Sequence, residues 1–155
     1  MEKIFFYEET PVGTLCIGEE NGAITRVTWN QIPAEAEQEE TALIARCKAQ
    51  LDEFFTGTRK VFDLPLGPKG TQFQQKVWQA LQEIPYGETR TYGEIAAAAG
   101  NPKAARAVGM ANNKNPIAIL IPCHRVVGSG GKLVGYAAGL EKKMWLLELE
   151  QGKHS

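Results

Sequence analysis

The chain has 155 residues, 43% of them hydrophobic, and a formal net charge of −1. No apolar run approaches the roughly 20 residues of a membrane-spanning helix, and the N-terminus lacks the apolar region of a signal peptide. Three cysteines make no paired disulfide framework, and two histidines without a Cys-x-x-Cys pair give no zinc motif. We expect no membrane partner and no metal, and a reducing compartment: the cytoplasm, or the nucleus if the source is a eukaryote.

Charge divides the chain into an acidic and a basic half. Residues 1–68 carry 6 Lys and Arg against 12 Asp and Glu, and residues 69–155 carry 11 against 6. The basic half, at +5, favours a polyanionic partner, although ordinary surface variation also gives differences of this size. A Pro- and Gly-rich stretch at 63–70 lies between the halves. We place a domain boundary there, with domains at 1–68 and 69–155.

The first thirty residues predict antiparallel strands. Pro11-Val12-Gly13 is a turn signal, and Asn21-Gly22 separates strands over 14–18 and 23–29, because both turn residues tolerate positive φ. Residues 31–40, rich in glutamate and glutamine, indicate a solvated loop or the start of a helix.

One helix completes the acidic half. Apolar residues at helical spacing predict a helix from Thr41 to Phe55, with Gly57 as its C-terminal stop. Cys47 lies on the apolar stripe, and Cys16 lies in a strand, so we interpret both as core thiols. The acidic half is therefore expected to be a small antiparallel sheet with one helix.

The basic half begins with two capping boxes. Thr71-x-x-Gln74 opens a helix that stops before Pro85, and Thr91-x-x-Glu94 opens a short alanine-rich helix to Ala99, where Gly100 ends it. Each threonine hydroxyl can accept a hydrogen bond from a free N–H of the first helical turn.

A further helix follows at once. Asn101-Pro102 supplies an N-cap and a proline for its first position, and we expect it to run to Ala111. Two helices joined so tightly predict a helix-turn-helix. Lys103 and Arg106 stand among alanines and glycine, and such small residues let a helix backbone approach a surface closely. The alternative is that the alanines pack in a core and Arg106 is simply solvated.

The tail from Leu140 to Glu150 predicts an amphipathic helix. Its expected apolar side is formed by Leu140, Met144, Trp145, Leu147 and Leu149. Glu150 stands at the helix C-terminus, where the dipole disfavours a carboxylate. Either it has a specific partner or the helix end is frayed and solvated.

The segment Ile121–Val127 carries the chemistry. Cys123 is followed by His124 and Arg125, and a thiol becomes a nucleophile when a base or nearby positive charge removes its proton. Neighbouring side chains of an extended segment point to opposite faces, so the pair cooperates only if the chain turns after Pro122 or a water bridges them. A buried structural thiol is the alternative.

Five segments of the basic half closely resemble the O6-alkylguanine-DNA alkyltransferases, the methylated-DNA–protein-cysteine S-methyltransferases. They are Asn101–Gly109, Asn115-Pro116, Ile121–Val127, Gly135-Tyr136 and Trp145–Leu147. The resemblance covers nearly all of residues 71–150, and the acidic half resembles the family mainly in layout. It implies an α+β fold: a ribonuclease H-like N-terminal domain, with a small antiparallel sheet and a helix, and a helical helix-turn-helix or winged-helix-like DNA-binding domain that carries the reactive cysteine.

The resemblance implies direct-reversal DNA repair. A damaged nucleotide of double-stranded DNA is flipped out of the stack, and the alkyl group of O6-alkylguanine, and of O4-alkylthymine, passes to Cys123. A thioether is not readily cleaved, so the transfer is irreversible and each molecule acts once. The family likeness further implies a monomer that needs no cofactor.

The resemblance also assigns roles to residues. Cys123 is the nucleophile and acceptor, His124 the base acting through a water, Glu150 the group that orients the imidazole, and Asn115 the brace of the preceding turn. DNA- and substrate-binding roles follow by the same likeness for Tyr92, Arg106, Asn101, Ser129, Tyr136 and Ala137. Arg106 matches an arginine finger that replaces the extruded base, and Tyr92 matches a tyrosine that crowds the flipped nucleotide and donates a hydrogen bond to the leaving guanine. The helix of small residues fits a minor groove about 6 Å wide.

Three other functions stay open at this stage. An alkyltransferase-like protein binds lesions without repairing them, but such proteins replace the cysteine that Cys123 provides here. A cysteine hydrolase would use the same Cys-His pair on an acyl carbon and would turn over. A helix-turn-helix regulator would use the thiol as a redox sensor.

Overall fold

The computed structural model describes residues 1–29, 32–33 and 35–154. Backbone contacts divide the chain into two compact units, Met1–Lys69 and Gly70–Ser155, and each is described by itself. None of the helices in the described ranges has the length and apolarity to span a bilayer.

The N-terminal unit is built on a four-stranded sheet in the order β3-β2-β1-β4. β1 (Glu2–Thr10), β2 (Gly13–Glu20) and β3 (Ala23–Trp29) form an antiparallel meander. Asn21 and Gly22 both have positive φ, 54° and 79°, as a tight hairpin requires. The predicted hairpin is confirmed.

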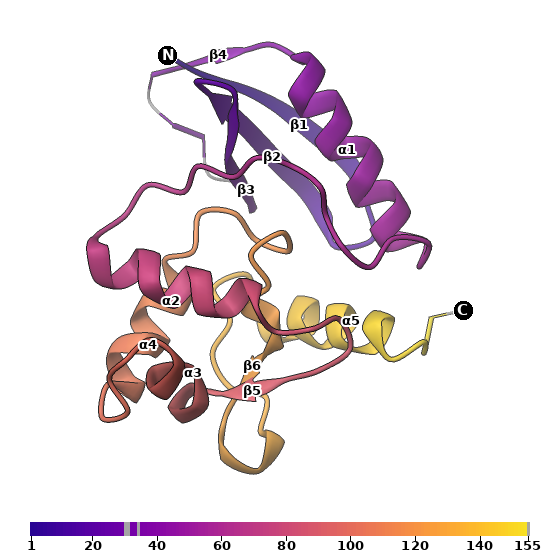
Figure 1. The fold of residues 1–155 in the computed structure, drawn as a ribbon. Coiled ribbons are helices and arrows are strands. Elements are labelled where there is room, and N and C mark those ends of the chain that lie inside the picture. The colour runs from indigo at the N-terminus through magenta and orange to yellow at the C-terminus, as the bar shows by residue number, and fades with distance from the viewer. Residues whose placement is uncertain (30–31, 34, 155) are drawn as a thin grey trace. The chain divides into compact units, whose positions relative to one another are not determined.

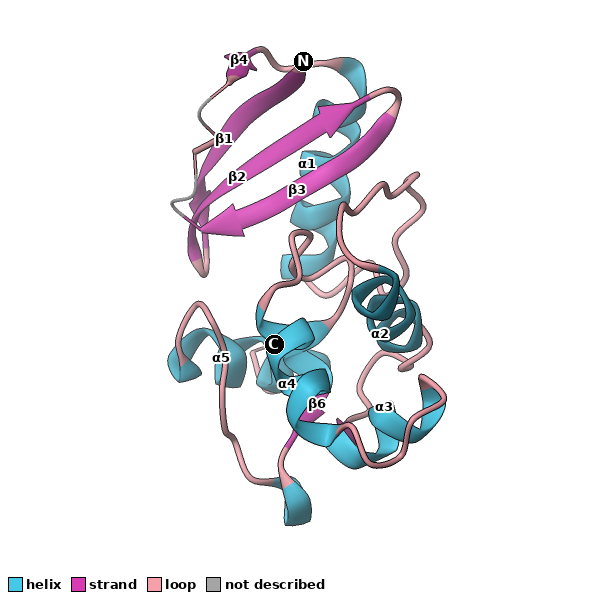
Figure 2. Ribbon diagram, turned by 90° about the vertical axis from the view of Figure 1, so that its left-hand side faces the viewer, coloured by secondary structure: helices cyan, strands magenta, loops and turns pink. Residues whose placement is uncertain are grey.

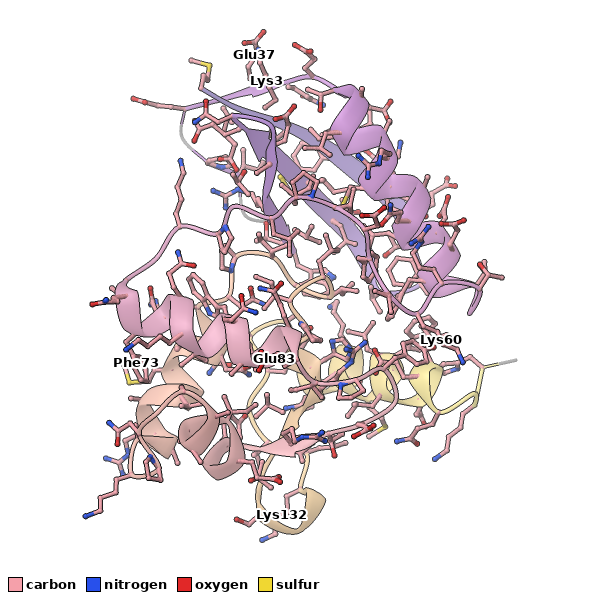
Figure 3. The ribbon with its side chains drawn as sticks, viewed as in Figure 1. Lys3, Glu37, Lys60, Phe73, Glu83 and Lys132 are labelled. Atoms are coloured by element: carbon pink, nitrogen blue, oxygen red, sulfur yellow. The ribbon has the colours of Figure 1, made fainter. Side chains whose placement is uncertain are left out.

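The fourth strand was not expected from the sequence. β4 (Ala36–Gln38) pairs in parallel with β1, within the stretch predicted to be a loop or the start of a helix. Its three residues are too few to show an alternating pattern, and an ion pair between Lys3 and Glu37 joins the two strands (Figure 3). Residues 31 and 34 of the same stretch lie outside the described residues.

α1 (Ala42–Phe55) covers one face of this sheet (Figures 1 and 2). It begins and ends close to the predicted points: the Thr41 hydroxyl accepts from the Ile44 N–H at 3.1 Å, and Gly57 has a φ of 82° just beyond the end. The buried core of the unit combines residues of this helix with strand residues: Leu15, Cys16, Ile17, Val27, Ile44, Cys47, Leu51 and Phe54.

The C-terminal unit is mainly helical. Its elements are α2 (Gln72–Gln82), β5 (Arg90–Thr91), α3 (Tyr92–Ala98), α4 (Ala105–Asn113), β6 (Val126–Val127) and α5 (Leu140–Glu150), with short 3-10 turns at Cys123–Arg125 and Ser129–Gly131. Both predicted capping boxes are present in full, at the start of α2 and of α3. The expected fold class, α+β with a small sheet followed by a helix-turn-helix unit, is confirmed.

The start of α4 corrects the sequence prediction. Asn101 does not cap this helix: its Oδ1 accepts from the Lys103 N–H at 3.3 Å, and its carbonyl accepts from the Ala104 N–H at 3.0 Å, so Asn101 and Pro102 form a turn. α4 then begins at Ala105 and extends to Asn113, beyond the expected end at Ala111. Asn-Pro favours a turn as strongly as a helix start, and here the turn prevails.

α5 has the predicted bounds, and its predicted apolar side is buried only in part. Leu147 and Leu149 are buried as expected, whereas Leu140 and Met144 are 45% and 46% exposed. The buried side also contains two charged residues, Lys143 and Glu150. Lys and Glu are rarely buried unless they are paired, so their burial on the inner face of α5 indicates a functional site beside this helix rather than a purely hydrophobic core.

Candidate active site

The chain reaches the reactive cysteine through a strained, tightly braced turn. The Asn115 side chain spans it: Nδ2 donates to the Ile121 carbonyl at 2.8 Å, and Oδ1 accepts from the Ile117 N–H at 3.0 Å. Ile119 lies between them, 1% exposed, with a φ of 72°. A β-branched residue in this region is strained, and such strain persists only where the surroundings fix the backbone.

The chain does turn at the cysteine. Cys123–Arg125 forms one 3-10 turn directly after Pro122, and the Cys123 N–H donates to the Ile121 carbonyl at 2.7 Å. β6 follows immediately and pairs in parallel with β5, which leads into α3. This short pairing ties the start of α3 to the reactive turn (Figure 1).

Behind the turn, a buried network joins an imidazole, a carboxylate and a guanidinium. His124 Nε2 lies 2.7 Å from Glu150 Oε2, and Arg125 binds both oxygens of Glu150, each at 2.9 Å. The Gly87 N–H donates to Glu150 Oε1 at 3.2 Å, and Arg125 Nη1 donates to the Ile84 carbonyl at 2.8 Å. The carboxylate at the end of α5 therefore has a specific partner, and the frayed, solvated end is excluded.

The pKa values fix the charges of this network. Burial would raise the pKa of Glu150, but the hydrogen bonds and charges of His124 and Arg125 outweigh it and hold that pKa at about 2. Burial lowers the pKa of His124, against the pull of Glu150. Because an ionised carboxylate only accepts hydrogen bonds, Nε2 carries the ring proton, and Nδ1 is left as the basic atom of a neutral imidazole.

The Cys123 side chain is a protonated thiol at neutral pH. Cys123 is 6% exposed, and burial raises its pKa, although side-chain hydrogen bonds from Asn115 and Tyr136 and the charge of Lys143 favour the thiolate. His124, the next residue in the turn, carries a neutral imidazole that can act as a base toward such a thiol, directly or through a water. The arrangement supports nucleophilic attack by sulfur, with His124 as base.

Two side chains near Cys123, one from α3 and one from α5, bind the loop that precedes α5. Lys143 Nζ donates to the carbonyls of Val134 and Gly135, at 3.0 and 3.2 Å. The Tyr92 hydroxyl donates to the same two carbonyls, at 3.1 and 3.4 Å. Burial and the nearby Cys123 raise the pKa of Tyr92, so its hydroxyl keeps its proton. Shared acceptors thus fix Tyr92 and the loop that carries Tyr136.

The sequence prediction missed two buried residues of this site. Lys143 was not foreseen, although it and Glu150 stand seven residues apart, which places them on one face of a helix. Asn112, 2% exposed, donates from Nδ2 to the Cys123 carbonyl at 3.3 Å. It follows Val108 by four residues, so helical periodicity predicts the inward face, but nothing in the sequence says what it would contact.

The remaining predicted site residues lie at the surface. Arg106 is exposed on α4, and Asn101, Ser129 and Ala137 are exposed in turns and loops. Contacts with DNA or substrate need such exposure, and these roles stay predictions. Within the described residues, no three His, Cys, Asp or Glu side chains are grouped so as to hold a metal ion.

Comparison with known proteins matches both halves of the chain to one family. Residues 72–152 match the DNA-binding domain of 6-O-methylguanine DNA methyltransferase, and residues 4–68 match its ribonuclease-like domain. A constitutive methylated-DNA–protein-cysteine methyltransferase of Bacillus subtilis is 52% identical over 152 residues, 92% of each chain. A methyltransferase of the same name from Methanosarcina acetivorans is 50% identical over 147 residues, 92% of this chain and 94% of its own.

Solved structures agree with these matches. The crystal structure of Mycobacterium tuberculosis OGT in complex with DNA is 42% identical, with a TM-score of 0.91 over 97% of this chain and 94% of that one. The M. tuberculosis O6-methylguanine methyltransferase structure is also 42% identical, with a TM-score of 0.89 over 99% and 94%. The buried His124–Glu150–Arg125 network directly after Cys123 and these matches lead to one conclusion: the chain belongs to the 6-O-methylguanine DNA methyltransferase family.

Proposed function

We propose that this protein repairs O6-alkylguanine in double-stranded DNA by moving the alkyl group to Sγ of Cys123. One observation carries the proposal: in one 3-10 turn, the buried Cys123 is followed directly by an imidazole that Glu150 holds at 2.7 Å, in a unit that also contains a helix-turn-helix. The relatives named above are methyltransferases of methylated DNA, and one was solved bound to DNA.

In the proposed reaction, sulfur attacks the alkyl carbon from the side opposite O6. The S–C bond forms as the C–O6 bond breaks, and the electron pair of that bond leaves with guanine. The thiol proton passes to Nδ1 of His124, where ionised Glu150 stabilises the imidazolium. The departing guanine anion takes up one proton from water while Tyr92 donates a hydrogen bond beside it, and the imidazolium returns the thiol proton to water, so the products are alkylated Cys123 and ordinary guanine.

The same chemistry makes the protein a single-use reagent. A thioether C–S bond is resistant to water and to imidazole, so the alkylated sulfur stays alkylated. The lesion supplies the alkyl group, and the reaction as written needs no methyl donor or other cofactor. O4-alkylthymine presents an equivalent oxygen-bound alkyl carbon and is the second proposed substrate.

We assign DNA binding to α4. Arg106 and Ala107 are exposed on it, and its small side chains let the backbone enter a minor groove about 6 Å wide. Arg106 then fills the space of the flipped base, Tyr92 crowds the flipped nucleotide, and Asn101 and Ser129 touch DNA. Tyr136 and Ala137 line the site that receives the base.

Both DNA binding and alkyl acceptance belong to residues 69–155 in this proposal. We infer that the protein acts as a monomer, since the residues proposed for catalysis all come from one unit of one chain. Its three cysteines are free thiols, which suits the cytoplasm or, in a eukaryote, the nucleus.

Intact mass spectrometry tests the proposal. After incubation with a duplex oligonucleotide that contains O6-methylguanine, the protein should gain one methyl group permanently, on the peptide that bears Cys123, and the DNA should contain unmodified guanine. Cys123→Ala should bind the duplex and gain nothing. A mass gain that disappears with time would indicate hydrolase chemistry, and binding with no gain in the wild-type protein would indicate a lesion-binding protein.

A further inference from the structure

Asn112 connects α4 to the reactive turn and has a function still to be assigned. It is 2% exposed, and its Nδ2 donates to the Cys123 carbonyl at 3.3 Å. Its Oδ1 is buried and has no hydrogen-bond partner among the residues that the structure describes. A buried amide oxygen without a partner is costly, so its retention next to a nucleophile points to a use in the reaction.

A second buried polar atom, in the residue that follows Cys123, also lacks a hydrogen-bond partner among the described residues. This atom is Nδ1 of His124, the basic atom of the imidazole. His124 directly follows Cys123 in the 3-10 turn, and Asn112 binds the carbonyl of Cys123. Two buried acceptors without a partner among the described residues therefore belong to residues that adjoin Cys123: one follows it in the chain, and the other binds its carbonyl.

Proton transfer from the thiol explains the need for both acceptors. A water that relays the proton accepts it from Sγ and donates one of its own hydrogens to Nδ1. Its other hydrogen then needs an acceptor, because a buried water makes about three hydrogen bonds. Oδ1 of Asn112 supplies that acceptor, while the Asn112 amide nitrogen holds the carbonyl of the same cysteine.

We propose that Asn112 is a positioning residue for deprotonation of Cys123, whose Oδ1 orients the water that carries the thiol proton to His124. The inference rests on the proposed function. It also gives α4 a second role, because the helix assigned to DNA binding holds the proton path of the nucleophile through its last turn.

Single-turnover rates measured against pH test this role. The variants are Asn112→Leu, which removes both polar groups, and Asn112→Asp, which keeps the shape and an acceptor but adds charge. Asn113→Leu is the matched control, because this neighbouring asparagine on α4 is exposed. Methyl transfer from an O6-methylguanine duplex is followed from about pH 6 to about pH 9.5, a range that brackets an ordinary thiol pKa. Circular dichroism and affinity for undamaged duplex establish that each variant is folded.

Asn112→Leu is expected to slow transfer about thirtyfold near neutral pH, within the range of a general-base contribution. The loss should shrink to about threefold at the alkaline end, where hydroxide deprotonates the thiol without the relay. For Asn112→Asp, the rising limb of the profile should move to higher pH, because a carboxylate beside the sulfur disfavours the thiolate. Asn113→Leu should match the wild type throughout.

Two results overturn the proposal. One is an Asn112→Leu loss that is equal at every pH, as a packing defect would give, or no loss at all. The other is an Asn112→Asp profile that coincides with the wild type, and this result decides the matter alone if Asn112→Leu does not fold. Failure of the wild-type protein to transfer methyl would instead refute the proposed function, so the two failures are distinguishable.

Discussion

At the scale of single residues, the site depends on one ionised carboxylate. Glu150 accepts from His124, from Nε and Nη2 of Arg125 and from the Gly87 N–H, and it is 7% exposed. Its negative charge fixes the imidazole tautomer and neutralises the buried guanidinium. The same residue therefore carries both stability and reactivity, and the two are measurable separately.

Glu150→Gln should destabilise the protein by about 3–5 kcal/mol at neutral pH, because it leaves the Arg125 charge buried and uncompensated. The pKa of Glu150 is lowered to about 2 from an unfolded value of 4.5. Its contribution is therefore full above that unfolded value and is lost as the pH falls toward the folded one. Urea unfolding at several pH values should show the difference between wild type and variant shrinking in acid.

Glu148→Gln is the control for this measurement. Glu148 stands two residues earlier on α5 with its side chain 39% exposed, so the free energy of unfolding should change by no more than about 0.5 kcal/mol. A Glu150→Gln difference that stays constant from neutral pH into acid would contradict the assigned ionisation.

Arg106→Ala addresses the proposed flipping step. A finger that replaces the extruded base stabilises the flipped state, and unstacking costs a few kcal/mol, so the repair rate should fall by about a hundredfold. Affinity for undamaged duplex should fall far less, since the variant loses only one of several positive charges that attract the DNA phosphates. Fluorescence anisotropy and single-turnover repair measure the two quantities, and equal losses in both would contradict the finger role.

At the scale of elements, the residues that mark helix starts account for most of the correctly predicted helix boundaries. The capping boxes at Thr71 and Thr91 correctly predicted the starts of α2 and α3. In this motif a Thr and a Glu or Gln three residues later accept hydrogen bonds from each other's backbone N–H, so the helix start is stabilised without tertiary contacts. Asn101 misled because its side chain serves an Asx turn as readily as a cap. β4 escaped detection because three residues carry no periodicity, and its pairing with β1 is fixed by the tertiary fold.

Thr91→Ala should reduce stability by about 1 kcal/mol, the usual cost of losing an N-cap. Its hydroxyl accepts from the Glu94 N–H at 3.1 Å, and the cap begins the helix whose first residue is Tyr92. Thr89→Ala is the matched control, since Thr89 is exposed two residues earlier. Chemical denaturation gives both values; equal effects of the two changes would mean that the capping box is not stabilising α3.

At the scale of the whole molecule, the sequence motifs indicated which segment carries the reactive residues, but not which buried side chains surround them. The family resemblance pointed to Cys123, His124 and Glu150, and the structure joins two of them, His124 and Glu150, by a hydrogen bond. Lys143 and Asn112 could not be named from the sequence, because an isolated lysine or asparagine in a helix is usually solvated. Only the folded chain shows them buried beside the thiol.

The uneven charge of the chain predicts how DNA binding responds to salt. Lys103→Gln should lower the steepness of the fall of log affinity with log salt by about one unit, the effect of one lost phosphate contact. Lys103 is exposed in the basic half, and Lys60 is exposed in the acidic half. Figure 3 labels Lys60 and a second exposed lysine of the basic half, Lys132. Lys60→Gln is the control and should leave the slope unchanged; equal changes in both variants would contradict DNA binding by the C-terminal half.

The central claim, that one sulfur accepts one alkyl group and keeps it, is tested most directly by titration with excess lesion. A fixed amount of protein is mixed with a large molar excess of O6-methylguanine duplex, and restored guanine is counted over time. Restoration should stop at one guanine per active protein molecule, with every Cys123 converted to S-methylcysteine. Continued restoration beyond that equivalence, or free Cys123 thiol at the end, would contradict the account.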